Sequence, residues 1–197
     1  DSDQALLLDF QAALETKPEK AIKLEKDALA QIETITADNA RLVSNLHANL
    51  GGLYRMNGHP DLAREHMEKS ISLLDQFNLL HINDSIPQIA NYAMFLTEQQ
   101  EPERGISELQ KLSGIIKEYH SDDCLDYAKV QETLGTIYLM TANLPQAKTH
   151  FKRAFKIYEK IWADEPEMIE AKYQEIQELY PQIGFCIGKN LSGLLTK

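Results

Sequence analysis

The sequence predicts an all-α fold made of antiparallel helix pairs, and two recurrences lead to this prediction. A Leu-Gly-x-x-Tyr pattern surrounds Gly51 and returns at Gly135, which is 84 residues later, or twice 42. Prolines at turn positions recur with the same 42-residue spacing, at Pro18, Pro60 and Pro102. A fixed period of this length is typical of arrays in which each helix pair packs on the next pair.

Apolar residues at helical spacing, separated by turn residues, place the first four helices. We expect these helices over residues 3–15, 18–36, 40–56 and 60–77. Pro18 suits the first turn of the second helix, where a backbone N–H has no partner inside the helix. Asp38 or Asn39 is expected to cap the third helix. Residues 57–60, Asn-Gly-His-Pro, stop that helix and start the fourth.

The second half of the chain follows the same pattern. We expect helices over residues 86–99 and 102–119, a helix pair within 128–161, and helices over 166–180 and 182–195. The polar residues 120–123 are expected to cap the seventh helix. Residues 182–195 are unusually apolar, and we interpret them as a terminal helix that covers the last open face. The alternative is that this segment docks on a second copy and forms a homodimer.

A single 42-residue register arranges these helices into one solenoid domain over residues 1–197. Its repeats lie near residues 2–43, 44–85, 86–127 and 128–163, followed by a C-terminal helix pair over 165–195. In the fourth repeat, Gly135 and Ala147 are small where two helices cross closely, and Leu134, Tyr138 and Phe151 fill the space around that crossing. The packing of this crossing is the physical basis of the pattern.

With this spacing, the chain resembles the tetratricopeptide repeat family over about residues 2–163. Its long repeat is similar to the subgroup that includes the kinesin light chains and many bacterial regulatory arrays. The resemblance implies a right-handed superhelix of about ten helices with a C-terminal capping helix. The first repeat departs from the family pattern, because it has Asp9 where glycine or alanine is usual and Glu25 where an aromatic residue is usual.

Composition argues against several classes of partner. A net charge of −10 disfavours nucleic acid and anionic membranes, and a basic or mainly apolar peptide is more compatible. No apolar run reaches the roughly 18 residues of a membrane span, so we expect no membrane insertion. Cys124 and Cys186 do not form a disulfide framework, which favours a cytoplasmic location. Since the chain does not begin with Met, we expect a processed protein or a piece of a longer one.

The sequence contains no persuasive catalytic or cofactor motif. There is no HExxH pair and no glycine-rich phosphate-binding loop. Residues 120–124, His-Ser-Asp-Asp-Cys, gather several types of metal ligand. A solvated helix start explains them better, because a four-coordinate metal needs ligands from more than one segment. We therefore expect no enzyme activity, no metal and no cofactor.

By resemblance to the family, the first helix of each pair lines a concave groove that binds a peptide or a partner helix. The candidate groove residues are Asn45, Asn49, Arg55, Met56, Asn91, Met94, Glu98, Lys129, Glu132, Thr136 and Met140. Asn49 and Asn91 lie one period apart, and an amide offers a peptide backbone both a donor and an acceptor. The methionines would add adaptable apolar contact. The alternative is that the asparagines are only solvated or bonded to their own neighbours.

Three functions are compatible with these observations. The first is a non-catalytic protein-interaction module that binds a peptide or partner helix in the groove. The second is the ligand-sensing part of a larger bacterial regulatory protein, which the full-length gene would reveal. The third is a self-associating scaffold that uses residues 182–195, which sedimentation would test.

Overall fold

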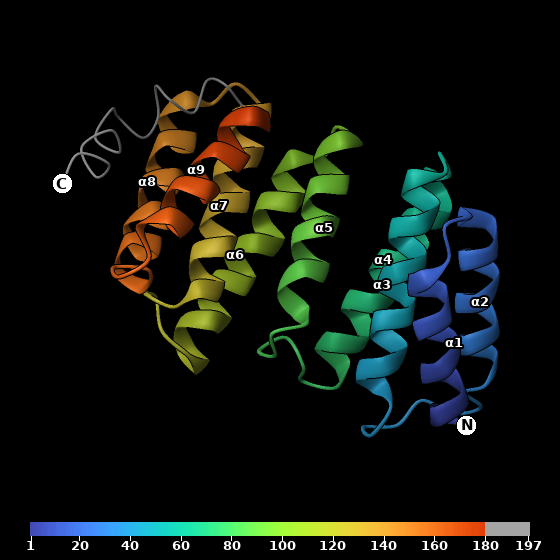
Figure 1. Ribbon diagram of the computed structural model, residues 1–197. Helices are drawn as coiled ribbons and strands as arrows, with labels where there is room; N and C mark the ends of the chain where they lie inside the picture. The colour runs from blue at the N-terminus through green and yellow to red at the C-terminus, as the bar shows by residue number, and fades with distance from the viewer. Residues whose placement is uncertain (180–197) are drawn as a thin grey trace. The chain divides into compact units, whose positions relative to one another are not determined.

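The computed structural model describes residues 1–179, which form helices and connecting loops (Figure 1). The helices within these residues are α1 (Ser2–Leu14), α2 (Pro18–Ala30), α3 (Ala40–Met56), α4 (Pro60–Gln76), α5 (Ser85–Glu98), α6 (Pro102–Tyr119), α7 (Leu125–Met140), α8 (Leu144–Ile161) and α9 (Pro166–Leu179). The predicted all-α class is confirmed. The helix predicted over 182–195, with its capping or dimer-forming role, lies outside the described residues. No helix among residues 1–179 has the length and hydrophobicity that a bilayer span requires.

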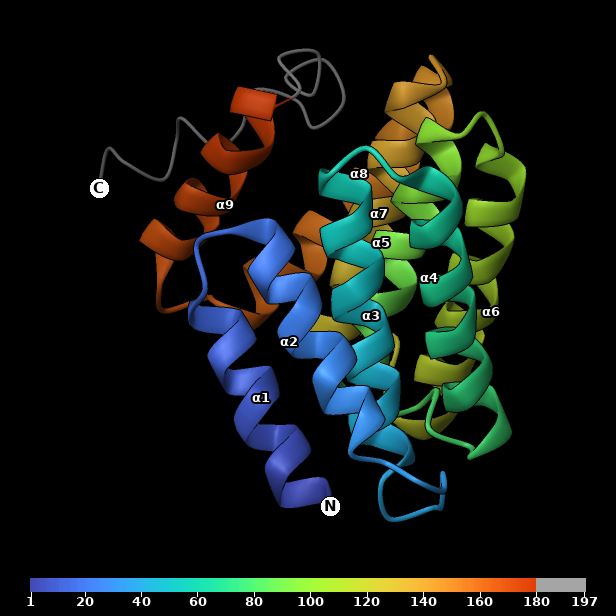
Figure 2. The ribbon, with the colours of Figure 1, turned by 90° about the vertical axis from the view of Figure 1, so that its right-hand side faces the viewer.

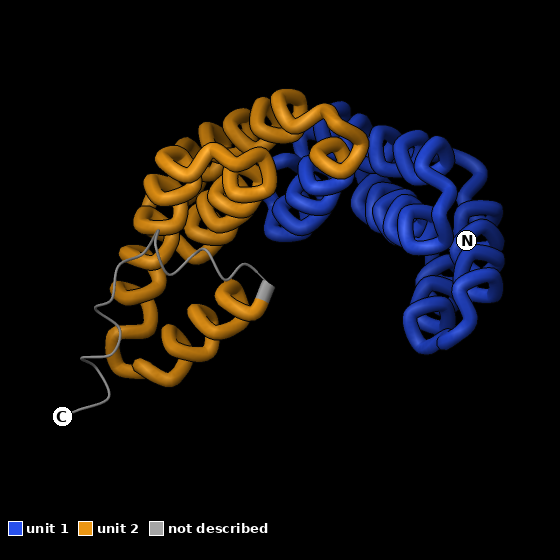
Figure 3. Tube along the Cα trace, turned by 90° about the horizontal axis from the view of Figure 1, so that it is seen from above, with its two compact units in different colours: residues 1–95 blue, residues 96–197 orange. Residues whose placement is uncertain are grey.

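The chain divides into two compact units, residues 1–95 and residues 96–197 (Figure 3). In the first unit α1 packs against α2, α2 against α3 and α3 against α4 (Figures 1 and 2). In the second unit α7 packs against both α6 and α8, and α9 packs on α8. The single solenoid over residues 1–197 and its repeat boundaries stay a prediction.

Glycines allow two of the helix pairs to cross at close range. A Cβ atom added at Gly51 of α3 would lie 2.6 Å from Cγ of Met67 and 3.3 Å from the carbonyl oxygen of Ala63, both on α4. A Cβ atom added at Gly135 of α7 would lie 3.0 Å from ring atoms of Phe151 on α8. The two glycines therefore have the packing role that their spacing predicts.

Three helices end in the same way at intervals of 42 residues. Shortly after α3, α5 and α7, the backbone takes a positive φ of 73° at Gly58, 65° at Gln100 and 58° at Ala142. In each case the next backbone N–H donates to the carbonyl oxygen five residues earlier, at 2.7–2.9 Å. This left-handed ending satisfies a free carbonyl group and turns the chain into the next helix. The period of the sequence thus recurs in the backbone geometry.

The second helix is shorter than predicted, because α2 ends at Ala30 and not near Thr36. The Asn39 side chain accepts from the backbone N–H of Thr36 at 2.8 Å and donates to the carbonyl oxygen of Thr34 at 2.9 Å. These local bonds give residues 34–39 an alternative to the helical hydrogen bonds. Ile35, predicted as the last apolar position of this helix, is 42% exposed.

The cap of the seventh helix lies one residue later than predicted. Cys124 caps α7, and its Sγ accepts from the backbone N–H of Tyr127 at 3.4 Å. The hydroxyl of Ser121 accepts from the N–H of Asp123, so the polar run stabilises the approach to the helix. Among residues 1–179, no three His, Cys, Asp or Glu side chains come together as a metal site requires.

A histidine pair joins α3 to α4. Nδ1 of His47 and Nδ1 of His66 are 2.8 Å apart, so one ring must donate to the other. Burial, and then the neighbouring His66 and Lys69, lower the pKa of His47 to about 4. The residues 84 positions later are Gln131 and His150, and Oε1 of Gln131 lies 2.9 Å from Nδ1 of His150. The second unit therefore makes the same contact with a side chain that does not titrate.

Replacement by alanine should destabilise the protein at Gly51, at the α3–α4 crossing, but not at the neighbouring Gly52. Gly51→Ala is expected to lower the free energy of unfolding, because the new Cβ would lie 2.6 Å from Cγ of Met67 and only 3.2–3.3 Å from backbone atoms of α4, so both helices must shift. Gly52→Ala is the matched control: a Cβ there meets nothing within 4 Å, so better helix propensity should stabilise the protein. Urea unfolding should separate the two variants by about 2 kcal/mol. Equal stability would contradict the close crossing.

The histidine pair should make the protein less stable in mild acid. The pKa of His47 is lowered from 6.5 to about 4, so the unfolded chain binds a proton that the folded chain does not. Its contribution to stability is full above pH 6.5 and is lost as the pH falls toward 4. His47→Gln, which copies Gln131, should flatten this part of the profile in urea unfolding between pH 7.5 and pH 4.5. An unchanged slope, matching that of the exposed control His120→Gln, would refute this role of His47.

Candidate functional site

A polar pocket of about 350 Å³ lies in the first unit. Helices α1, α3 and α5, together with the residue that precedes α5, supply its lining. The lining residues are Asp9, Asn45, Ala48, Asn49, Asp84, Pro87, Gln88 and Asn91. Two carboxylates and four amides thus surround a space large enough for a side chain or a short stretch of extended peptide.

Three of the predicted groove residues meet in this pocket. Asn45 and Asn49 come from α3, and Asn91 comes from α5. Asn49 and Asn91 are exposed, whereas Asn45 is half-buried. Side chains one period apart therefore line one surface, which is what their matched positions predict. Whether this surface binds a peptide stays a prediction.

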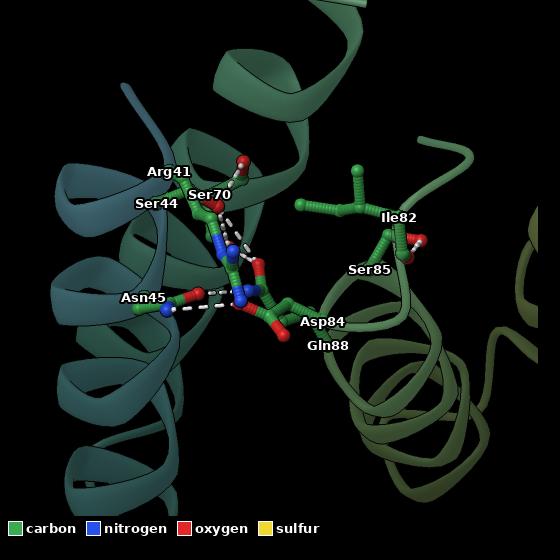
Figure 4. A network of polar contacts seen from close by, with 8 residues as sticks. All are labelled: Arg41, Ser44, Asn45, Ser70, Ile82, Asp84, Ser85 and Gln88. Carbon is green, nitrogen blue, oxygen red and sulfur yellow. Dashed lines mark hydrogen bonds and ion pairs between the residues drawn. The ribbon is translucent and has the colours of Figure 1, made fainter. Parts of the chain in front are cut away.

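Behind the pocket, a buried polar network joins α3, α4 and α5 (Figure 4). Oε1 of Gln88 accepts from the hydroxyl groups of Ser44 at 2.8 Å and Ser70 at 2.5 Å. Nε2 of Gln88 donates to Oδ1 of Asn45 at 2.6 Å. Because Ser44 and Ser70 are fully buried, their hydroxyl groups depend on these bonds. The network fixes α5 against α3 and α4 and holds the Asn45 amide in one orientation.

Asp84 is balanced by a cation on α3. Nε of Arg41 donates to Oδ2 of Asp84 at 2.6 Å, and Nδ2 of Asn45 donates to the same oxygen at 3.3 Å (Figure 4). The Arg41 guanidinium holds the pKa of Asp84 below its usual value. Asp84 therefore adds little uncompensated charge to the pocket.

Asp9 on α1 lines the pocket and forms a pair of carboxyl groups with Glu25 on α2, which is not in the lining. Nδ2 of Asn49 donates to both, at 2.9 Å to Oδ1 of Asp9 and at 3.0 Å to Oε1 of Glu25. Glu25 is only 2% exposed, and its Oε2 has no hydrogen-bond partner. Burial, followed by the charge of Asp9, raises the pKa of Glu25 to about 8. The Glu25 carboxyl group is therefore mainly protonated at neutral pH.

The other predicted groove residues of the first unit do not line this pocket. Arg55 and Met56 lie about two helical turns beyond Asn49, at the end of α3. Met56 is 81% exposed, and Met94 is half-buried on α5. Neither methionine belongs to the pocket lining, and the predicted methionine contacts stay a prediction.

The second unit has its own pocket of about 270 Å³, with a mainly apolar lining. The lining residues are Leu125, Lys129, Tyr158, Trp162, Met168, Ala171, Lys172 and Glu175. The rings of Tyr158 and Trp162 stack with centroids 4.9 Å apart. Of the predicted groove residues, Lys129 lines this pocket.

Glu132 supports the second pocket from behind. Its Oε2 accepts from the hydroxyl group of Tyr158 at 2.6 Å, and its Oε1 lies 3.0 Å from Nζ of Lys172. Burial lowers the pKa of Lys172, but the Glu132 carboxylate outweighs burial and leaves that pKa raised. This glutamate is therefore committed to internal contacts. The remaining predicted residues lie outside the lining: Glu98, Thr136 and Met140.

Sequence reasoning missed Asp84 and Gln88 as pocket residues. The residues one period before and after Gln88 are Leu46 and Val130, both buried and apolar. Gln88 could have been found in the sequence, because it is a polar residue at a position that is apolar in the neighbouring repeats. The same signal was present at Asp9 and Glu25, which were recognised as departures but not as a site.

Comparison with known proteins supports the interpretation of the repeats. Residues 85–160 match the family model of the tetratricopeptide repeat. BtubC (BKLC) from P. vanneervenii has a similar solved structure, with a TM-score of 0.71 and 19% identity over 92% of this chain and 72% of that chain.

A second similar structure is that of a protein from Podospora anserina assigned as a kinesin light chain, whose TPR-like repeats are nearly identical to one another. Its TM-score is 0.64, at 14% identity over 74% of this chain and 69% of that chain. Both likenesses show a shared fold. No curated protein matches the chain by sequence.

Removing the buried carboxyl group should stabilise the protein more at pH 8 than at pH 5. The pKa of Glu25 is raised from 4.5 to about 8, so its contribution to stability is full below pH 4.5 and is lost as the pH rises toward 8. Glu25→Gln removes the titrating group, and its amide oxygen can still accept from Asn49. Urea unfolding at both pH values checks this, with the exposed Glu33→Gln as control. An equal change in stability at pH 5 and pH 8 would show that Glu25 titrates normally.

Proposed function

We propose that the first unit binds an extended segment of a partner protein in the pocket lined by Asn45, Asn49 and Asn91, because residues 85–160 match the tetratricopeptide repeat model and the chain shares the fold of similar repeat structures. A role in protein–protein interaction is typical of tetratricopeptide repeat modules in general. The proposal adds the location of the contact and the form of the partner.

The presence of two exposed asparagines, Asn49 and Asn91, in one pocket carries this proposal. Both polar atoms of the Asn45 amide beside them are already engaged, by Asp84 and Gln88. An exposed amide such as that of Asn91 offers a donor and an acceptor, the two groups that an extended backbone presents in alternation. Asn49 keeps its carbonyl oxygen as an acceptor while its N–H groups are engaged by Asp9 and Glu25. The partner's main chain can therefore be recognised with little dependence on its sequence.

The rigidity of the pocket also supports binding. Gln88 and the two buried serines fix α5, so the walls are ordered before a partner arrives. A preorganised site loses less conformational entropy when it binds. A cytoplasmic location, expected from the two cysteines, belongs to this proposal.

The test is a comparison of peptide affinities. Peptides selected from a displayed library against the protein would be titrated by fluorescence polarisation against the wild type and Asn91→Ala. We expect Asn91→Ala to weaken binding about 5-fold, since one hydrogen bond contributes roughly 1 kcal/mol. Asn49 is unsuitable for this purpose, because its removal also deprives Glu25 of its donor.

Gln76→Ala is the matched control, because it removes an exposed amide from α4 outside the pocket lining. It should leave the affinity unchanged. If Asn91→Ala binds the selected peptides as tightly as the wild type and Gln76→Ala do, the partner does not occupy this pocket.

A further inference from the structure

The pocket of the first unit has one carboxylate that no cation balances. Within the part of the chain that the structure describes, Asp84 pairs with Arg41, whereas Asp9 interacts with the neutral amide of Asn49 and with the carboxyl group of Glu25, neither of which is a cation. Asp9 lies in the pocket lining and is half-buried. A carboxylate in such a place loses part of its hydration without gaining an opposite charge.

A second carboxyl group, that of Glu25, is bonded to the pocket residue Asn49. Glu25 is 2% exposed, and its carboxyl group reaches Asn49, which is itself part of the pocket lining. Its Oε2 is buried without a hydrogen-bond partner. Because Glu25 also interacts with Asp9, the two carboxyl groups form a coupled pair, and a change of charge at Asp9 is felt by Glu25.

The repeat pattern shows that packing alone does not call for these carboxyl groups. One period after Asp9 and Glu25 stand Gly51 and Met67, which form the close crossing of α3 with α4. The first helix pair thus has two acidic side chains where the second has a tight apolar contact. Local departures of this kind are expected at functional sites.

We propose that the pocket beside Asp9 takes a cationic side chain, lysine or arginine, of the bound segment, with Asp9 as its counter-ion. This inference rests on the proposed function and adds the chemistry of the partner. The carboxylate of Asp9 would pair with the cation, and the carbonyl oxygens of Asn49 and Asn91 would accept its remaining N–H groups. The net charge of −10 favours the approach of such a segment.

Binding of a cation should also release a proton from Glu25. The groups that face Glu25 are Asp9 from α1 and Asn49 from α3, and the negative charge of Asp9 opposes ionisation of Glu25. A cation on Asp9 cancels this effect and lowers the pKa of Glu25 from about 8. Since the bound form then holds fewer protons, affinity should rise with pH toward pH 8.

The experiment compares two peptides that differ only in charge. An acetylated and amidated Gly-Gly-Arg-Gly-Gly peptide and its citrulline counterpart are titrated to about 10 mM, because single-side-chain binding is weak. NMR then follows the side-chain amide signals of Asn49 and Asn91. We expect the arginine peptide to shift both signals and to bind at least 5-fold more tightly than the neutral peptide. Its affinity should also be several-fold higher at pH 8 than at pH 6.

Variants separate the role of charge from general damage to the fold. Asp9→Asn should reduce the affinity of the arginine peptide to that of the citrulline peptide. Asp61→Asn, which removes an exposed charge at the start of α4, should not change it. Glu25→Gln should keep arginine binding but remove its dependence on pH.

Each contrary result has a definite meaning. If both peptides shift the two amide signals equally, the inference about charge is overturned while the proposed peptide-binding function stands. If neither peptide shifts them, the inference is overturned, and the library peptides decide the proposed function separately. Loss of arginine binding in Asp61→Asn to the same degree as in Asp9→Asn would overturn the assignment of Asp9.

Discussion

The distance at which paired helices cross is the constraint on which the rest of this structure depends. At Gly51 and Gly135 the partner helix comes so close that no Cβ atom fits without a shift of its neighbours. Such contacts fix the angle and register of each pair through close packing. The first pair has Asp9 and Glu25 at the equivalent positions in the 42-residue period. There the contact is polar, and a pocket lies beside it.

The buried polar side chains of the first unit fix one arrangement of α3, α4 and α5, and they occupy positions where apolar side chains could pack. Gln88, Ser44 and Ser70 bond to one another in a buried setting, where an unpaired polar group is costly. Residues one period later at the same places are apolar, including the buried Ile86 and Leu112. We interpret the network as the support that orders the pocket wall, since only a fully paired set of partners satisfies it.

The sequence was sufficient for features that depend on spacing and insufficient for those that depend on contact. The helix pairs and the crossing at Gly51 follow from the period. So does the presence of Asn49 and Asn91 in the lining of one pocket. The end of α2 at Ala30 depends on which bonds Asn39 makes, and a helical apolar pattern conceals that competition. The raised pKa of Glu25 depends on burial, which becomes visible only when three helices are assembled.

The most direct test of this account is the titration of Glu25 itself, followed through its side-chain carboxyl carbon by NMR in the wild-type protein. The account predicts a midpoint near pH 8, because the group is buried beside Asp9 in the folded chain. It also predicts that the midpoint falls in Asp9→Asn, where the opposing charge is gone. A midpoint near 4.5 in the wild-type protein, the value of a solvated glutamate, would contradict the buried carboxyl pair and the pocket chemistry built on it.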